Sequence, residues 1–276
     1  MNRQAALRHA KQKLIEANCE NAKQEARWML EQLLNEDGLP INCEHIPQTT
    51  LQKLESMLER RQNGEPLQYI LGNTAFHCLE LLIGPGVLIP RPETEILVEE
   101  ALQLYPGRGL VCDLCTGSGA IALAMAKNLP HTTFIAGDIS ASALRWARLN
   151  QKKNQIDNVT FLQSNLFQAL PSTYFSLLTA NPPYISKQEY QDLPKEVLEY
   201  EPKLALLSGD EGLDLLQRII CEAPAHLEPE AWILLEIGST QGAAIYEILR
   251  RSAWRDIRIR KDYSGHDRIA IARNPL

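Results

Sequence analysis

The sequence predicts an α/β protein in which a small helical domain precedes a mostly parallel sheet. From residue 109 onward, short apolar runs alternate with segments of helical periodicity, which is the pattern of a parallel sheet covered by helices on both faces. Before residue 64, apolar residues recur at steps of three and four, as amphipathic helices require. A third observation, the turn Asn181-Pro182-Pro183-Tyr184 after a buried strand, indicates a functional site.

The N-terminal region, residues 1–72, reads as a bundle of helices joined by polar segments. Its third helix is predicted over Thr49–Gln62 and ends at Asn63-Gly64, a common helix stop. Nothing in this region suggests catalytic chemistry. We therefore expect a substrate-docking domain, with a lid or spacer as the alternative.

Residues 73–90 form the predicted link between the two domains. The stretch Phe76–Ile89 is apolar and is broken by Gly84-Pro85-Gly86, which indicates a hairpin or an extended connector. The catalytic domain is then predicted over residues 91–276, and it opens on a helix with Glu93 and Glu95 in its first turn, where acidic side chains suit the positive helix end.

Within this domain, predicted strands and helices follow one another along the chain. The predicted strands are 110–114, 133–138, 159–163, 175–180 and 232–237; the predicted helices are 120–129, 142–151, 213–225 and 243–251. The last two extended segments, 256–260 and 268–272, are predicted to form an antiparallel hairpin at the edge of the sheet.

Asn181-Pro182-Pro183-Tyr184 follows the buried run Phe175–Ala180. Each proline lacks an N–H and restricts φ, so this backbone cannot continue a sheet ladder. It can instead present carbonyl oxygens and one amide side chain in a rigid array beside an aromatic ring. Such an array suits a planar amide or amino group that must place two N–H donors.

A glycine-containing loop, Asp113 to Gly119, follows the first strand and opens a helix, at the sheet edge where α/β proteins bind ligands. Asp138 ends the second strand and could accept hydrogen bonds from ribose hydroxyls. These features fit NAD and S-adenosylmethionine alike. Asp113 favours the latter, because a carboxylate suits a cationic methionine end and not a pyrophosphate. Asn165-Leu166 stands where an adenine ring would rest, although strand-end packing explains these residues nearly as well.

Composition restricts the remaining classes of function. The net charge of −6, with basic residues scattered along the chain, disfavours nucleic acid as the main partner. Cys112 and Cys115 have a C-x-x-C spacing, but no second ligand pair accompanies them, so no metal is expected. No apolar run is long enough to span a membrane, and the N-terminus lacks a secretory signal, so a cytoplasmic location is expected.

Three segments together resemble one family, the HemK/PrmC glutamine N5-methyltransferases. They are Pro90-Arg91-Pro92-Glu93-Thr94-Glu95, Asp113-Leu114-Cys115-Thr116-Gly117-Ser118-Gly119 and Asn181-Pro182-Pro183-Tyr184-Ile185. The resemblance extends over nearly the whole chain. It implies a class I methyltransferase fold with a seven-stranded sheet, S-adenosyl-L-methionine as cofactor, and class 1 peptide-chain release factors as protein substrates, methylated on the glutamine of their Gly-Gly-Gln motif.

The resemblance also implies roles for individual residues. Cofactor contacts carry over to Asp113, Cys115, Thr116, Gly117, Ser118, Gly119, Asp138, Leu166 and Asn181, and substrate contacts to Asn181, Pro182, Pro183 and Tyr184. Two positions depart from the family pattern. Cys115 replaces the first glycine of the loop and is expected to have an ordinary negative φ, and Leu166 replaces an aromatic residue that commonly covers adenine.

The mechanism implied by the resemblance relies on positioning. The Asn181 side-chain oxygen and the Pro182 carbonyl would accept the two N–H groups of the substrate amide, and Tyr184 would pack on its flat face. Because the methyl group is already activated on a sulfonium, in-line transfer needs no dedicated general base. Competing interpretations are an adenine N6-type nucleic-acid methyltransferase, glutamine methylation of a ribosomal protein, a nicotinamide oxidoreductase and a non-enzymatic binding module.

Overall fold

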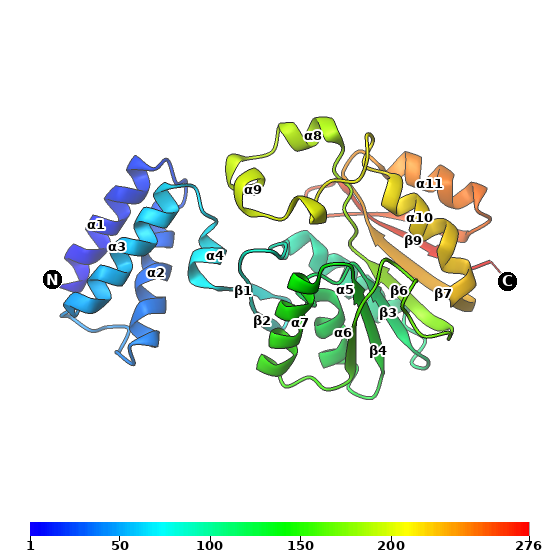
Figure 1. Cartoon of the computed structure of the whole chain (residues 1–276), viewed down its shortest axis with the longest axis horizontal. Helices are drawn as coiled ribbons and strands as arrows, with labels where there is room; N and C mark the ends of the chain where they lie inside the picture. The colour runs from blue at the N-terminus through cyan, green and yellow to red at the C-terminus, as the bar shows by residue number, and fades with distance from the viewer. Residues whose placement is uncertain (276) are drawn as a thin grey trace. The chain divides into compact units, whose positions relative to one another are not determined.

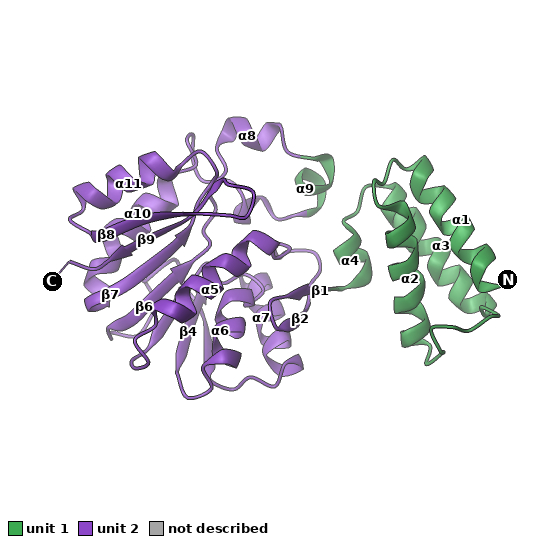
Figure 2. Ribbon diagram, turned by 180° about the vertical axis from the view of Figure 1, so that it is seen from behind, with its two compact units in different colours: residues 1–73, 194–200 green, residues 74–193, 201–276 purple. Residues whose placement is uncertain are grey.

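The computed structural model describes residues 1–275. The chain forms two compact units, coloured separately in Figure 2. Unit 1 comprises residues 1–73 together with 194–200, and unit 2 comprises residues 74–193 and 201–276. Each unit has a hydrophobic core of its own.

Unit 1 is a bundle of helices. They are α1 (Arg3–Glu16), α2 (Ala22–Glu36), α3 (Gln48–Gln62), α4 (Leu67–Leu71) and α9 (Lys195–Tyr200), the last contributed by a distant part of the chain. The side chain of Asn2 caps α1 by accepting a 2.8 Å hydrogen bond from the Ala5 N–H, which satisfies a donor that the first helical turn leaves free. Leu14, Met29 and Leu58 are fully buried between the three long helices, as the three- and four-residue spacing predicts.

One arginine ties α9 to the bundle. Arg61 donates from Nε to Glu25 Oε2 and from Nη1 to Glu196 Oε2, each at 2.8 Å. Glu25 is only 6% exposed, so its carboxylate depends on this partner. The Tyr200 hydroxyl also donates to the Asn63 carbonyl, which adds a second attachment.

Unit 2 begins at Thr74, within the first strand of a two-stranded hairpin formed by β1 (Asn73–Phe76) and β2 (Leu79–Leu82). The chain reverses at His77-Cys78, where His77 has a φ of 51°. Gly84-Pro85-Gly86 therefore lies after the hairpin, in the segment that connects it to the following helix.

The main sheet has seven strands in the order β5-β4-β3-β6-β7-β9-β8 (Figure 1). Its strands are β3 (Val111–Leu114), β4 (Phe134–Asp138), β5 (Val159–Gln163), β6 (Phe175–Ala180), β7 (Leu227–Glu236), β8 (Arg255–Lys261) and β9 (Asp267–Arg273). Neighbouring strands from β5 through β4, β3 and β6 to β7 pair in parallel, whereas β9 pairs antiparallel with both β7 and β8. The predicted parallel sheet with an antiparallel edge is confirmed.

Helices cover both faces of this sheet. The helical segments of unit 2 are η1 (Pro92–Thr94, a short 3-10 turn), α5 (Glu95–Leu104), α6 (Ala120–Asn128), α7 (Ala141–Lys153), α8 (Lys187–Gln191), η2 (Lys203–Ala205), α10 (Asp214–Glu222), η3 (Ala223–His226) and α11 (Gly242–Arg251). The sheet is covered by α5, α6 and α7 on one face and by α10 and α11 on the other. One core contains α5, α6 and α7 with Val111, and the other contains α10 and α11 with Cys112. Alternate strand residues therefore enter different cores, which explains why β3 and β6 are buried throughout.

The strand register aligns several functional candidates at one edge of the sheet. Leu114 of β3 pairs with Gly137 of β4 and with Ala180 of β6, and Ala180 pairs in turn with Leu235 of β7. The next residues along these strands are Asp138, Cys115, Asn181 and Glu236. β3 and β6 are also the neighbours at which the strand order reverses, the position where open α/β sheets bind ligands.

None of the helices formed by residues 1–275 is both long enough and apolar enough to cross a membrane.

We expect Arg61→Ala to destabilise unit 1 by roughly 3 kcal/mol, because it leaves the Glu25 carboxylate buried without a partner. Loss of helical circular dichroism in urea measures the effect. Arg27→Ala is the matched control: Arg27 is 59% exposed in its pair with Glu31, and such surface pairs contribute less than about 1 kcal/mol. Equal losses in the two variants would contradict the structural role of Arg61.

Candidate active site

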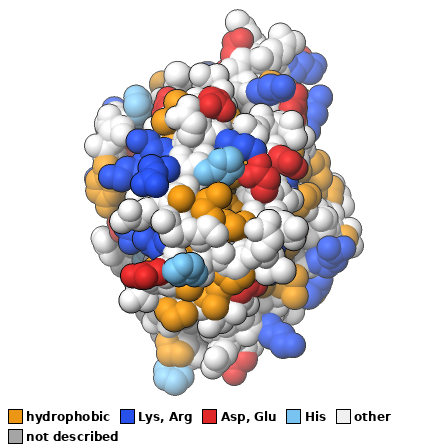
Figure 3. All heavy atoms as spheres, turned by 90° about the vertical axis from the view of Figure 1, so that its left-hand side faces the viewer, with side chains coloured by type: hydrophobic (Ala, Val, Ile, Leu, Met, Phe, Trp, Pro, Cys, Tyr) orange, Lys and Arg blue, Asp and Glu red, His pale blue; other side chains and the backbone are white. Residues whose placement is uncertain are grey.

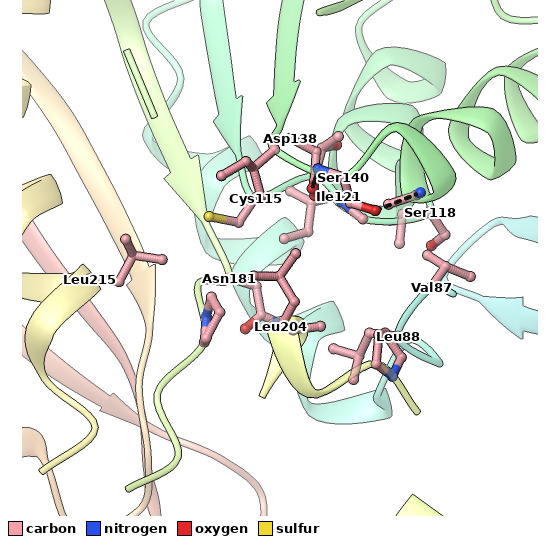
Figure 4. A pocket seen from close by; sticks show the side chains of 18 of the residues that line it. Val87, Leu88, Cys115, Ser118, Ile121, Asp138, Ser140, Asn181, Leu204 and Leu215 are labelled. Carbon is pink, nitrogen blue, oxygen red and sulfur yellow. Dashed lines mark hydrogen bonds between the residues drawn. The ribbon is translucent and has the colours of Figure 1, made fainter. Parts of the chain in front are cut away.

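A cavity of about 330 Å³ opens at the carboxyl edge of the sheet, beside the end of β6 (Figure 4). Its walls come from the loops after β3, β4, β5 and β6, from the first turns of α6 and α7, from the segment before α5, and from residues 202–205. Leu215 and Arg218 of α10 complete the lining. Predicted site residues on the wall are Cys115, Thr116, Gly117, Ser118, Asp138, Leu166, Asn181 and Pro183. The predicted site residues that do not line the cavity are Asp113, Gly119, Pro182 and Tyr184.

The loop after β3 forms a tight turn against the cavity. Cys115, Gly117 and Gly119 have φ values of 55°, 57° and 81°, all in the left-handed region. The expectation that Cys115 has an ordinary negative φ is wrong. The Thr116 N–H donates to the Gly137 carbonyl at 3.1 Å and ties this turn to the neighbouring strand.

Asp113 is enclosed behind this loop. Its side chain is fully buried and accepts hydrogen bonds from the Thr116 hydroxyl at 2.6 Å and from the Thr179 hydroxyl at 2.8 Å. Burial raises the pKa of this carboxyl to about 7, against the effect of the two hydroxyls. Asp113 therefore holds the loop in place, and it does not reach the cavity wall.

Asp138, at the end of β4, lies on the cavity wall (Figure 4). Its carboxylate oxygens accept from the backbone N–H groups of Gly117 and Ser140, each at 2.8 Å. Burial raises its pKa, and these backbone donors act in the opposite direction. The carboxylate is thus oriented by the main chain on both sides, and its remaining lone pairs can accept from a ligand.

Leu166 and Asn165 form another part of the wall, after β5. Leu166 has a φ of 52°, and its carbonyl accepts a 2.6 Å hydrogen bond from the Ser164 hydroxyl. This turn brings the apolar Leu166 side chain to the cavity even though the residue is only 5% exposed.

Asn181 stands where β6 ends, and its side-chain Nδ2 donates to the Thr94 hydroxyl oxygen at 3.3 Å. Its neighbour Pro182 is buried, while Pro183 lines the cavity. The Tyr184 hydroxyl donates to Glu236 Oε1 at 3.2 Å, and its carbonyl accepts from Gln241 Nε2 at 2.8 Å. Burial and the adjacent Glu236 carboxyl raise the pKa of Tyr184.

Two residues of this site escaped the sequence reasoning. Thr94 lines the cavity and contacts Asn181, although it lies 87 residues earlier in the chain. Glu236 contacts Tyr184 from the neighbouring strand. Thr94 belongs to the segment Pro90-Arg91-Pro92-Glu93-Thr94-Glu95, but no local pattern links either residue to Asn181.

A buried glutamate joins two walls of the cavity. Glu201 accepts from the Ile89 N–H at 3.1 Å and from the Arg91 guanidinium. Both partners of Glu201 are next in sequence to Pro90, and Glu201 is followed by Pro202. Leu88, Pro90 and Pro202 all line the cavity. The ion pair therefore fixes the two loops against one another.

Residues 1–275 contain no group of three or more histidine, cysteine, aspartate or glutamate side chains arranged to hold a metal ion.

The raised pKa of Asp113 predicts a pH dependence of stability. The carboxyl ionises near pH 3.8 in an unfolded chain and near pH 7 in the fold, so it favours the folded state at low pH. That contribution is lost as the pH rises through this interval. We therefore expect the free energy of unfolding of the wild type, minus that of Asp113→Asn, to fall by a few kcal/mol between about pH 4 and about pH 7. Urea unfolding at several pH values measures it, and a difference that rises with pH would contradict the burial argument.

Comparisons with known proteins place this arrangement in a family. Residues 5–72 match the family model described as the PrmC N-terminal domain, and residues 92–203 match the methyltransferase small domain. The chain is 37% identical over 263 residues to a release factor glutamine methyltransferase of Geobacter sulfurreducens, covering 94% of this chain and 92% of the relative. It is 40% identical over 253 residues to one of Thermodesulfovibrio yellowstonii, covering 90% and 91%.

Solved structures share the fold at lower sequence identity. A methyltransferase from Pyrococcus furiosus has a TM-score of 0.56 at 18% identity, covering 73% of this chain and 92% of that one. A ribosomal protein L11 methylase from Lactobacillus delbrueckii has a TM-score of 0.51 at 20% identity, covering 70% and 84%. These structural likenesses concern the methyltransferase fold alone. The sequence identities to the curated relatives extend across both units, and these identities show that this chain belongs to the release factor glutamine methyltransferase family.

Proposed function

We propose that this protein transfers the methyl group of S-adenosyl-L-methionine to the side-chain amide nitrogen of a glutamine in class 1 peptide-chain release factors, within their Gly-Gly-Gln motif. The observation that carries the proposal is the amide of Asn181 at the end of β6, on the wall of a cavity at the sheet's switch point. The names of the curated relatives support the same substrate class.

The cavity suits the cofactor in size and in chemistry. A volume of about 330 Å³ falls within the usual range for small-molecule sites. Asp138 offers oriented carboxylate oxygens to ribose hydroxyls, the loop from Cys115 to Ser118 lines the cavity, and Leu166 offers an apolar face for adenine. The bound cofactor would supply a methyl group already activated on a sulfonium.

Recognition of the substrate amide falls to Asn181 and its neighbour. An amide nitrogen is a weak nucleophile because its lone pair is delocalised into the carbonyl. In our proposal the Asn181 Oδ1 and the Pro182 carbonyl accept its two hydrogens, hold the nitrogen in line and stabilise the positive charge that develops on it. No side chain serves as a dedicated base, and the surplus proton passes to water.

Tyr184 does not line the cavity, but we assign it a role in holding the substrate. We propose that its ring borders the substrate amide while its hydroxyl, bonded to Glu236, holds the ring in one orientation. The tyrosine thus restricts the rotamers open to the glutamine side chain, a role in turnover more than in cofactor binding.

We also propose a separate role for each of the three segments of the chain. Residues 1–72 would dock the release factor, and residues 73–90 would link this domain to the catalytic domain. Residues 91–276 would bind the cofactor and carry out the methyl transfer. Figure 3 shows apolar side chains gathered among charged ones on the face it presents, and the N-terminal unit exposes the large apolar residues Ile15, Trp28 and Ile41. Exposed apolar groups rimmed by charge are typical of protein-binding surfaces. The site of action would be the cytoplasm, where release factors work.

Methyl transfer from labelled S-adenosylmethionine tests the function directly. We expect label on an unmodified class 1 release factor and none on the same protein with its Gly-Gly-Gln glutamine replaced by alanine. Label on both proteins would move the modification to another residue. Absence of label from both, with cofactor binding shown by calorimetry, would overturn the release factor as substrate.

Asn181→Ala should lower kcat by about 100-fold or more, because the substrate amide loses an acceptor that acts during transfer. Cofactor affinity, measured by calorimetry on the same preparation, should change little, since the loop and Asp138 remain. A variant that kept kcat within about tenfold of wild type would remove Asn181 from the reaction.

A further inference from the structure

The main-chain carbonyl of Tyr184, at the end of the Asn181–Tyr184 turn, is held by a side chain that lies 57 residues later in the chain. Gln241 stands at the N-terminal end of α11 and is 8% exposed, and its Nε2 donates to the Tyr184 carbonyl at 2.8 Å. The same nitrogen makes a longer contact, 3.4 Å, with the Gly212 carbonyl. Neither Gln241 nor Gly212 lines the cavity, and the mechanism above gives them no role.

The backbone around Gln241 fixes the orientation of its amide. Gln241 Oε1 accepts from the Gly238 N–H at 2.8 Å. A backbone N–H can only donate and a backbone carbonyl can only accept, so the amide cannot turn over without losing its bonds to both Gly238 and Tyr184. The Gln241 N–H also donates to the Gly238 carbonyl at 3.0 Å, which fixes the main chain from which the side chain extends. Gln241 therefore presents its N–H donors to Tyr184 and not its oxygen.

Gly212 allows a second segment to approach the same carbonyl. It is buried and has a φ of 76°, in the left-handed region. A Cβ on this residue would overlap the Tyr184 carbonyl oxygen and would lie 2.8 Å from Gln241 Nε2. Only glycine therefore lets the loop of residues 206–213 pass this close to the end of the turn.

The Asn181–Tyr184 turn is thus anchored at both ends. It starts directly after Ala180, which pairs with both neighbouring strands of the sheet. It is followed by Ile185, whose N–H donates to the Leu206 carbonyl and whose carbonyl accepts from the Ser208 N–H, each at 2.9 Å. The two prolines between these anchors restrict φ, so the segment has little freedom of its own. The position of its last carbonyl therefore helps to set where the two proposed acceptors of the turn point.

We propose that Gln241 and Gly212 are positioning residues for methyl transfer: by fixing the Tyr184 carbonyl, they hold the Asn181–Tyr184 turn in the orientation that aligns the substrate amide with the cofactor methyl group. The inference rests on the proposed function and deepens it. A misplacement of about 1 Å among reacting groups can lower a rate by about 100-fold. The loop after β3 and Asp138 are held by other bonds, so loss of this anchor acts on turnover more than on cofactor binding.

Variants at the two positions disturb one atom by different means. Gln241→Glu keeps an acceptor for the Gly238 N–H but turns a second oxygen toward the Tyr184 carbonyl. Gln241→Met retains a side chain of similar length and removes both bonds. Gly212→Ala leaves the glutamine unchanged and displaces the Tyr184 carbonyl through its Cβ. Matching effects at both positions would assign the loss to this carbonyl.

The same unit offers a matched control for each substitution. Gly209→Ala introduces a Cβ at a φ of 73° on the same loop, but its nearest atoms belong to the carboxylate of Asp214, an exposed side chain that can move aside. Asn274→Asp replaces another buried amide outside the cavity, one whose Nδ2 donates to the carbonyls of Leu227 at 3.3 Å and Glu228 at 3.0 Å.

We expect Gln241→Glu, Gln241→Met and Gly212→Ala to lower kcat for release-factor methylation by about tenfold or more, with cofactor affinity within about threefold of wild type by calorimetry. Gly209→Ala and Asn274→Asp should keep the kcat of wild type. Equal losses in Gly209→Ala and Gly212→Ala would assign the effect to backbone strain. Full kcat in Gln241→Glu, or a fall in cofactor affinity parallel to kcat, would also overturn the proposal.

A second measurement needs no substrate. Hydrogen exchange of the Ile185 N–H, followed by nuclear magnetic resonance, reports the order of the chain directly after the turn. Exchange should be slow in wild type and in both controls, and faster in Gln241→Glu and Gly212→Ala. Equal exchange in all five proteins would overturn the positioning role. A wild type that exchanges slowly and binds cofactor but does not methylate a release factor would overturn only the proposed function.

Discussion

The parallel register of four neighbouring strands is the constraint on which the site depends. Because Leu114 pairs with both Gly137 and Ala180, and Ala180 with Leu235, the residues that follow all arrive at one edge of the sheet. Pro182 lacks an N–H and ends the ladder of β6 at that edge, so Asn181 is the last residue that the sheet itself positions. A slip of one residue in β6 would turn Asn181 to the opposite face, and no loop rearrangement would restore its relation to Thr94.

Acidic groups dominate the electrostatics of this edge, and each is satisfied in a different way. Hydroxyls bind Asp113, backbone N–H groups bind Asp138, and Tyr184 binds Glu236. The charge on Asp138 adds to burial in raising the pKa of Asp113, which shows that the acids interact. Burial raises the pKa of all three carboxyls, so each is closer to its neutral form than an exposed acid would be. Asp113 itself is enclosed behind the loop with its pKa raised to about 7, so its predicted contact with the cofactor stays a prediction.

Local pattern predicted the elements well and the contacts between them poorly. The bounds of β5 and β6 agree with the sequence-based ranges, because apolar runs between turn residues define a buried strand without reference to the rest of the chain. Asp138 and Asn181 could be placed at strand ends for the same reason. The left-handed φ of Cys115 could not be predicted, because the intrinsic preference of a non-glycine residue is for a negative φ. The contacts of Thr94 and Glu236 could not be predicted either, because they span separations of 87 and 52 residues.

The role proposed for the Asn-Pro-Pro-Tyr turn concerns the chemistry of transfer more than the choice of substrate. Two acceptors in a rigid array suit any planar group with two N–H donors, and an adenine amine meets that description as well as a glutamine amide does. Discrimination therefore has to come from the groups around the turn. The part of the cavity wall formed by Leu88, Pro90, Pro202 and Leu204 is apolar, and the Glu201–Arg91 ion pair holds its two loops together. With a net charge of −6, the chain also lacks the long-range attraction that nucleic-acid enzymes use, which leaves a protein-borne amide as the substrate that the site and its surroundings favour together.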